Sequence, residues 1–130
     1  MLGLLLALSC AKGTSPKSVD SGLFCDSLPD LGGGGGKRKA AEVKGKVHEH
    51  LDRFEACYRE ALKQDPNARG RVEVRFAIEA DGSVSSACVH KTTLEDGDAV
   101  ECMLGEFRAL KFGPSAGKSV VIYPLTFSGG

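Results

Sequence analysis

The apolar residues between positions 42 and 64 recur every three to four residues, which is the period of an amphipathic helix. Cys57 lies three residues after Phe54, so its side chain falls on or beside the same apolar stripe. Pro66 disfavours helical backbone at the residue before it, so the pattern predicts one helix over residues 42–64. The stripe consists of Val43, Val47, Leu51, Phe54, Tyr58, Ala61 and Leu62.

Apolar and polar residues alternate strictly over residues 71–78, which predicts a half-buried β-strand. Asp81 and Gly82 follow this strand and predict a tight hairpin turn, because the pair tolerates the positive φ that such turns need. A second strand is expected near residues 84–91.

Two hairpin loops are possible before this second strand, and they turn different residues towards the core. A two-residue hairpin loop turns Ala87 and Val89 towards the core. A longer loop with a bulge at Gly82 turns Cys88 and His90 inward instead. The apolar residues of the strand do not share one parity, and a bulge inside the strand would reconcile them. They are Val84, Ala87 and Val89.

A second helix is expected to begin near residue 93, with Thr93 or Asp96 as its N-cap. Cys102 lies beside the apolar stripe of this helix. Gly113 and Pro114 are expected to end the helix. The stripe consists of Val100, Met103, Leu104, Phe107 and Leu110.

Residues 119–127 are rich in Val, Ile, Tyr and Phe and predict a third strand. Pro124 inside this strand indicates an edge position or a bulge. The resulting order is helix, strand, strand, helix, strand. Three antiparallel strands with both helices packed on one face would bury the two helical stripes. The pattern therefore predicts an α+β domain over residues 42–130.

Composition narrows the choice of partners and compartment. Lys+Arg and Asp+Glu are both 17, so the chain lacks the basic surplus that is typical of a nucleic-acid partner. There is no Trp, and six Phe and two Tyr supply only a modest core, which covalent staples would help to stabilise. Five cysteines in such a chain favour an oxidising compartment.

The N-terminus indicates export. The apolar run over residues 2–9 is too short to span a bilayer, which needs ~20 residues, but is long enough for a signal peptide. The stretch from Ala7 to Cys10 resembles the bacterial lipobox, in which the cysteine becomes the first mature residue and carries the lipid. Residues 1–10 are therefore expected to be a signal segment with Cys10 lipidated. The simpler alternative is a cleaved signal with an incidental cysteine.

Residues 11–41 are rich in Gly, Ser and Lys and are expected to form a disordered linker. A run of five glycines, from Gly32 to Gly36, precedes Lys37, which invites a comparison with the phosphate-binding P-loop. That motif needs Gly at position 31 and Ser or Thr at position 38. The chain has Leu31 and Arg38 there, so no nucleotide is expected.

An ordered set of residues runs through positions 42–127. Its members are Cys57, Tyr58, Ala61, Leu62, Pro66, Gly70, Val72, Val74, Phe76, Ile78, Asp81, Gly82, Val84, Thr93, Leu94, Val100, Cys102, Phe112, Tyr123, Pro124, Leu125 and Phe127. This set resembles the C-terminal domain family named after the gliding-motility proteins AgmX and PglI, which is in turn similar to the TonB C-terminal domain. The resemblance implies a TonB C-terminal-like domain of the cell envelope.

The resemblance also implies a disulfide between Cys57 and Cys102 that joins the two helices. Closing a loop of this length stabilises a protein by ~4 kcal/mol in the chain-entropy model. Cys25 and Cys88 would then form a second disulfide or stay as free thiols.

No metal, cofactor or catalytic group is expected. His48 and His50 lie about 200° apart around a helix and do not share one metal easily, and His90 lacks a ligand set at known spacing. The carboxylates near the second helix start suit the helix dipole. They are Glu95, Asp96, Asp98 and Glu101. No serine or cysteine stands in a known nucleophile motif.

The function expected from these features is a non-catalytic interaction module on the periplasmic side of the cell envelope, anchored to a membrane by lipid. Its partners would be envelope or membrane proteins that add a strand at the exposed edge. The expected binding edge is Val120, Val121, Ile122 and Tyr123. The alternative is a small periplasmic thiol-redox protein or enzyme with a free low-pKa thiol at Cys25 or Cys88. A third possibility is a purely structural lipoprotein.

Overall fold

A computed structural model describes residues 18–25 and 38–128. The predicted signal segment with Cys10 and the glycine run lie outside these residues. The helices and strands in chain order are η1 (Ser21–Leu23), α2 (Ala40–Glu49), α3 (Leu51–Gln64), β1 (Gly70–Ile78), β2 (Val84–Thr92), α4 (Gly97–Arg108) and β3 (Ser119–Phe127).

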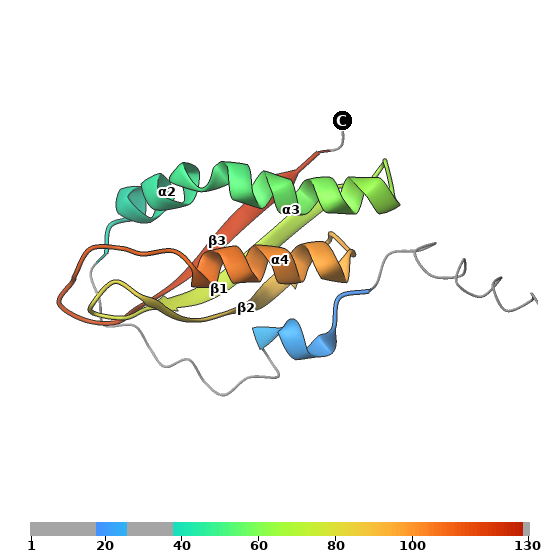
Figure 1. Ribbon diagram of the computed structural model, residues 1–130. Coiled ribbons are helices and arrows are strands. Elements are labelled where there is room, and N and C mark those ends of the chain that lie inside the picture. The colour runs from blue at the N-terminus through green and yellow to red at the C-terminus, as the bar shows by residue number, and fades with distance from the viewer. Residues whose placement is uncertain (1–17, 26–37, 129–130) are drawn as a thin grey trace, which may run out of the picture.

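The strands form one antiparallel sheet in the order β2-β1-β3. Figure 1 shows α2, α3 and α4 lying together across one face of this sheet. The prediction of an α+β fold with a three-stranded antiparallel sheet is therefore confirmed.

The helical stretch predicted over residues 42–64 is divided into α2 and α3 at His50. The backbone of His50 leaves the helical region (φ −110°, ψ 14°). Its N–H bonds the carbonyl of Val47 at 3.0 Å, and its Nδ1 lies 3.2 Å from the carbonyl oxygen of Lys46. The prediction of one unbroken helix is therefore wrong. The spacing of the apolar residues is the same on both sides of His50, so the sequence pattern gave no sign of the break.

The second strand adopts a register that combines the two predicted solutions. Ile78 pairs with Val84, as in the longer loop, yet Ala87 and Val89 are buried in the core. A register shift between Ala77 and Ile78 changes the parity of β2 at that point. This is the bulge inside the strand that reconciles its apolar residues.

The second helix begins and ends at identifiable contacts. The side chain of Asp96 accepts a hydrogen bond from the N–H of Ala99 at 3.0 Å, which makes Asp96 the N-cap. The helix ends at Arg108 rather than at Gly113. The expected end is wrong because the following segment bonds to the β1–β2 hairpin, where the N–H of Phe112 donates to the carbonyl of Gly82 at 2.8 Å.

Aromatic rings connect the two layers of the core. Phe107 of α4 lies 4.7 Å from Phe54 of α3 and 5.0 Å from Phe76 of β1, measured between ring centroids. Tyr58 of α3 stacks on Phe127 of β3 at 4.6 Å. The few aromatic residues of the chain are thus concentrated where the helices meet the sheet.

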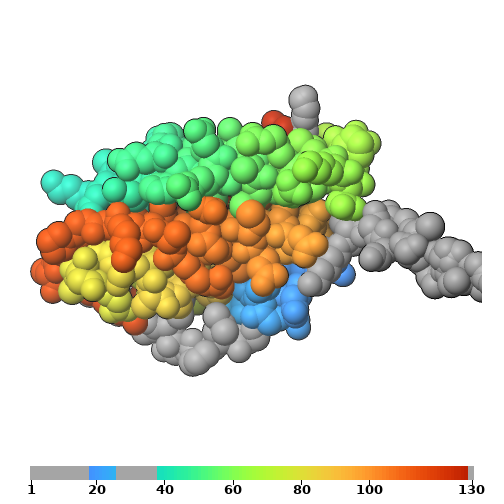
Figure 2. All heavy atoms as spheres, in the orientation of Figure 1, coloured from blue at the N-terminus to red at the C-terminus, as the bar shows by residue number. Residues whose placement is uncertain are grey.

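Residues 18–25 differ from the predicted linker. This segment, which we call the strap, contains η1 and forms a parallel bridge from Phe24 to Val89 of β2. Leu23 and Phe24 are partly buried against the core. Figure 2 shows the strap (blue) packed against the body of the domain. The composition of residues 11–41 hid this docking, because it depends on a contact with β2 that is remote in sequence.

Arg38 anchors the chain again where the described residues resume. Its side chain is only 2% exposed, and its Nη1 lies 2.7 Å from the carboxylate of Glu42. The guanidinium also lies over the ring of Phe112, with 5.4 Å between its central carbon and the ring centroid. The start of α2 is therefore attached to the segment between α4 and β3.

Candidate functional site

Two disulfides join the four cysteines of the described residues. Cys57 of α3 is bonded to Cys102 of α4, with 5.6 Å between their Cα atoms. This is the pair that the resemblance implies. Cys25 of the strap is bonded to Cys88 of β2, with 5.0 Å between their Cα atoms. Of the two states left open for these two cysteines, the structure has the bonded one.

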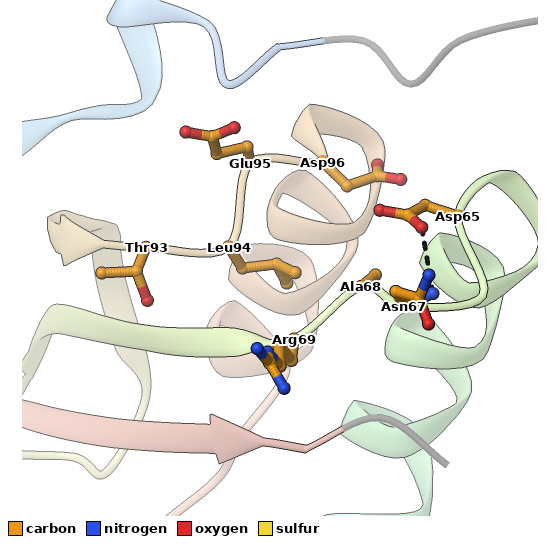
Figure 3. Close-up of a pocket in the computed structure, with 8 residues that line it drawn as sticks. All are labelled: Asp65, Asn67, Ala68, Arg69, Thr93, Leu94, Glu95 and Asp96. Atoms are coloured by element: carbon orange, nitrogen blue, oxygen red, sulfur yellow. Dashed lines mark hydrogen bonds between the residues drawn. The ribbon is translucent and has the colours of Figure 1, made fainter.

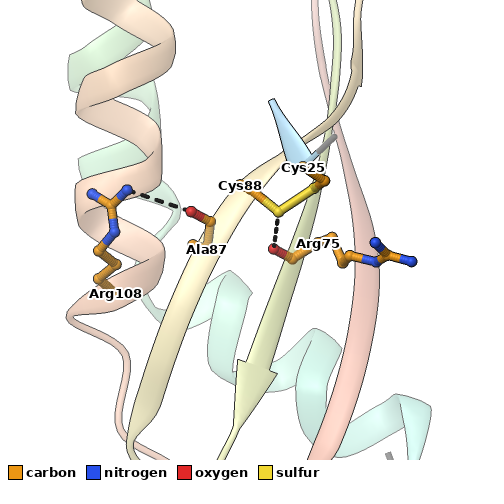
Figure 4. The surroundings of a disulfide bond; sticks show 5 residues. All are labelled: Cys25, Arg75, Ala87, Cys88 and Arg108. Atoms are coloured by element: carbon orange, nitrogen blue, oxygen red, sulfur yellow. Dashed lines mark hydrogen bonds between the residues drawn. A yellow bond between two sulfur atoms is a disulfide. The ribbon is translucent and has the colours of Figure 1, made fainter. Parts of the chain in front are cut away.

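Figure 4 shows the surroundings of the strap disulfide. The sulfur of Cys88 lies 3.7 Å from the carbonyl oxygen of Arg75 on the neighbouring strand. The side chain of Arg75 extends from this point away from the disulfide, across the sheet. Because all four cysteines of the described residues are paired in disulfides, none of them is the free thiol that the alternative thiol-redox function requires.

The opposite edge of the sheet is formed by β3. Its residues pair with β1 from Ser119 to Phe127 without a register shift, and among the described residues no strand pairs with its other side. The expected binding edge is divided between the two faces. Val121 and Tyr123 pack against the core, whereas Ile122 on the other face is 46% exposed. Val120 on that same face is half-buried.

A groove of about 230 Å³ runs beside β3, where the strand meets α2 and α3. Leu51 belongs to its lining and is 36% exposed, although the sequence places this residue in the buried stripe. The sequence pattern missed this groove, since the exposure of Leu51 follows from the helix break beside it. The lining residues are Val47, His48, Leu51, Glu55, Tyr123, Pro124, Leu125, Thr126 and Phe127.

A second hollow of about 180 Å³ lies between the end of α3 and the start of α4 (Figure 3). The carboxylates of Asp65 and Asp96 lie near one another there. Asp65 accepts a hydrogen bond from the N–H of Asn67 at 2.9 Å, and Asp96 caps α4. Both carboxylates are therefore accounted for by a turn and a helix cap.

A third hollow of about 520 Å³ separates the strap from the end of β2. It is lined by Val19 and Phe24 of the strap and by Leu94 after β2, with polar groups at its rim. The polar lining residues are Ser18, Thr92 and Glu95.

In the part of the chain that the structure describes, no three His, Cys, Asp or Glu side chains gather as a metal site would require. His48 and His90 are both exposed. Within residues 18–25 and 38–128, no helix has the length and apolar character needed to cross a bilayer.

The pKa of Asp81 is lowered by hydrogen bonds in the hairpin turn. The backbone N–H of Ser83 donates to its carboxylate at 2.9 Å, and the hydroxyl of Ser83 donates at 2.7 Å. Both bonds favour the charged carboxylate. Both bonds lie within the β1–β2 turn and hold it together, so the turn itself explains the lowered pKa.

Comparisons with protein-family models, with curated proteins and with solved structures gave no significant match to the chain.

Proposed function

We propose that this chain is a non-catalytic protein-interaction module of the bacterial cell envelope, with a TonB C-terminal-like domain carried on a lipid anchor at Cys10. Its partner is an envelope or membrane protein that contributes an extended segment to the β3 edge. The observation that carries the proposal is the unpaired side of β3 among the described residues. An unpaired strand edge is a template for another strand, and main-chain hydrogen bonds then supply affinity.

The usable part of this edge is limited by Pro124. Proline has no N–H, and edge strands accommodate it with its nitrogen facing solvent. Alternate residues of a strand direct their N–H groups to the same side, so Ile122 presents a donor on the side where Pro124 lacks one. An incoming strand therefore pairs with the first half of β3, from Ser119 to Tyr123.

The groove beside β3 meets this pairing segment at Tyr123 and continues along residues 123–127. A strand that adds to β3 directs alternate side chains towards the helical layer, where the groove of about 230 Å³ lies. Leu51 and Tyr123 offer it apolar surface, and His48 and Glu55 offer polar groups. Strand pairing would provide the affinity, and the groove would select the side chain that the added segment places beside Tyr123.

Ile122→Pro tests the proposal. The substitution removes the free-edge donor while leaving the β1 side of β3 intact, because the two sides use alternate residues. Ile122→Thr is the matched control, since it keeps the N–H and the β-branched shape. Partners are captured from extracts of the native host without reductant and identified by mass spectrometry.

We expect an envelope protein that wild type and Ile122→Thr capture, with recovery reduced at least about tenfold by Ile122→Pro. Thermal unfolding of both variants checks that the domain is folded. Equal recovery by Ile122→Pro, or capture of no envelope protein by the wild type, would contradict the proposed function.

The envelope location is tested separately by the intact mass of the protein from its native host. A mature chain that begins at Cys10, with the added mass of a lipid and the loss of four hydrogens for two disulfides, is expected. A mass that retains residues 1–9 and carries no lipid would refute the anchor.

A further inference from the structure

The two disulfides cross-link parts of the molecule that differ in their other contacts. Cys57 and Cys102 lie on α3 and α4, which also meet through the rings of Phe54 and Phe107, 4.7 Å apart. These helices share the buried core, so their packing holds the two sulfur atoms close together whether or not they are bonded. Reduction of this bond leaves two thiols that are still neighbours.

Within the part of the chain that the structure describes, the strap packs less deeply than these helices. Two of its backbone hydrogen bonds are internal, from Leu23 to the carbonyl of Asp20 at 2.9 Å and from Phe24 to the carbonyl of Ser21 at 3.2 Å. The side chain of Asp20 accepts from Gly22 within the same turn. The strap meets the domain through the bridge from Phe24 to β2 and through side chains that are only partly buried. A segment whose apolar side chains are only partly buried opens at a lower free-energy cost than the core once its covalent link is broken.

We propose that Cys25–Cys88 is a redox switch that releases the strap while the rest of the domain stays folded. A dithiol reductant is the co-reactant. One of its thiolates attacks a sulfur of the bond and forms a mixed disulfide, and its second thiol then displaces the protein sulfur. The protein gains two electrons and two protons as the thiols of Cys25 and Cys88, and the reductant leaves as its own disulfide.

Release of the strap has two structural consequences. It uncovers the side of β2 at Val89, which the bridge from Phe24 covers, and it opens the hollow of about 520 Å³ next to Thr92. Among the described residues, Arg38 then becomes the first that contacts the domain. A fully extended chain as long as residues 18–37 spans at most about 70 Å.

The second consequence links the switch to the proposed lipid anchor. With Cys10 in a membrane, the bonded form holds the domain near the anchor, and the reduced form lets it reach further. This use of the switch rests on the proposed function. The release itself does not, because it depends only on the strap, β2 and a reductant.

The test uses the full oxidised chain, equilibrated with graded ratios of reduced to oxidised dithiothreitol. Alkylation and peptide mapping report the state of each bond, and hydrogen exchange reports backbone protection. We expect half-reduction of Cys25–Cys88 at a ratio at least about tenfold lower than for Cys57–Cys102. At that ratio, residues 18–25 lose protection and β2 exchanges faster near Val89, while α3 and α4 stay protected.

Equal midpoints for the two bonds, or earlier reduction of Cys57–Cys102, would overturn the inference. So would strap residues that remain protected after their bond is reduced. The paired variant Cys25→Ser with Cys88→Ser provides a second measurement, because it must show the same exchange pattern without reductant. None of these readouts involves β3 or a partner, so this test and that of the proposed function fail independently.

Discussion

The two edges of the sheet are built differently. The β2 edge follows a tight hairpin, contains register shifts and is bridged and bonded by the strap. The β3 edge follows a longer connection, pairs with β1 without a shift and carries Ile122, which is 46% exposed. Only Pro124 interrupts its donors, at the half of the strand that lies nearest the C-terminus.

This difference indicates which edge is available to a partner. Bulges, covering segments and proline are the devices by which proteins prevent unwanted strand pairing. They are concentrated on β2, and β3 has one of them. A second chain that pairs with the sheet therefore meets least obstruction between Ser119 and Tyr123.

The largest loss of stability is expected from removing the Cys57–Cys102 disulfide, which lies between two helices and at neither edge of the sheet. Cys57→Ala with Cys102→Ala is expected to lower the free energy of unfolding by about 4 kcal/mol, because the unfolded chain loses a loop constraint while the folded helices still pack. Denaturant unfolding without reductant measures this loss. If the strap only covers an edge, its own bond must contribute less. A loss below 1 kcal/mol at the helix bond would contradict the distinction.

Gly82→Ala should damage the β2 side specifically, by about 3 kcal/mol. Gly82 has φ 96°, and an added Cβ would lie 1.8 Å from the carbonyl oxygen of Phe112. The hairpin and the segment after α4 must therefore separate. Chemical denaturation quantifies the loss, and hydrogen exchange should show it spreading along β2.

Gly45→Ala is the matched control for this substitution. Gly45 lies in α2, and an added Cβ there has no atom within 4 Å. Alanine is the better helix former, so this change should stabilise the protein by about 0.5 to 1 kcal/mol. Similar effects of the two substitutions would show that the hairpin does not depend on close approach at Gly82.

Removing the Cys25–Cys88 disulfide should leave the β2 edge less covered, as the β3 edge already is, with a modest loss of stability. In the folded protein, Cys25 is tethered to Arg38 by residues 26–37, whereas in the unfolded chain it is separated from Cys88 by 63 residues. The ratio of these loop lengths corresponds to about 1 to 2 kcal/mol of stabilisation. Cys25→Ser with Cys88→Ser should lose this amount in denaturant unfolding. A loss as large as that at the helix bond would mean that the strap belongs to the core.

The strands were the part of the fold most open to prediction from sequence. Residues 119–127 coincide with β3. Pro124 indicated an edge position or a bulge, and the structure has the edge position, because the effect of proline on a strand is local. For β2 the sequence offered two registers, and the bulge in the strand gives it one feature of each: Ile78 pairs with Val84, and Ala87 and Val89 face the core. The sequence alone could not choose between them, since the choice depends on how Phe112 and the helices cover the hairpin.

The strap and the groove were harder to foresee because each depends on contacts remote in sequence. Leu23, Phe24 and Cys25 form a visible apolar cluster, but nothing local assigns them to β2. The groove depends on the break at His50, which leaves Leu51 half out of the core. The β3 part of the candidate site could therefore be predicted from periodicity. The part of the groove formed by α2 and α3 could be identified only from the tertiary structure.

The smallest expected effect is a pH dependence of the hairpin at the start of β2. The folded-state pKa of Asp81 lies below the ordinary value of 3.8 because Ser83 donates to its carboxylate. Its contribution to stability is therefore present above about pH 4 and is lost as the pH falls through the lowered pKa.

Asp81→Asn removes this titration. Wild type should be slightly more stable than the variant at pH 7, and the difference in denaturant midpoint should vanish towards pH 2. Because Asp81 is exposed, the difference is small. A difference that stays the same at both pH values would show that the charge of Asp81 does not support the turn, and the β2 edge would lose one of its local stabilising contacts.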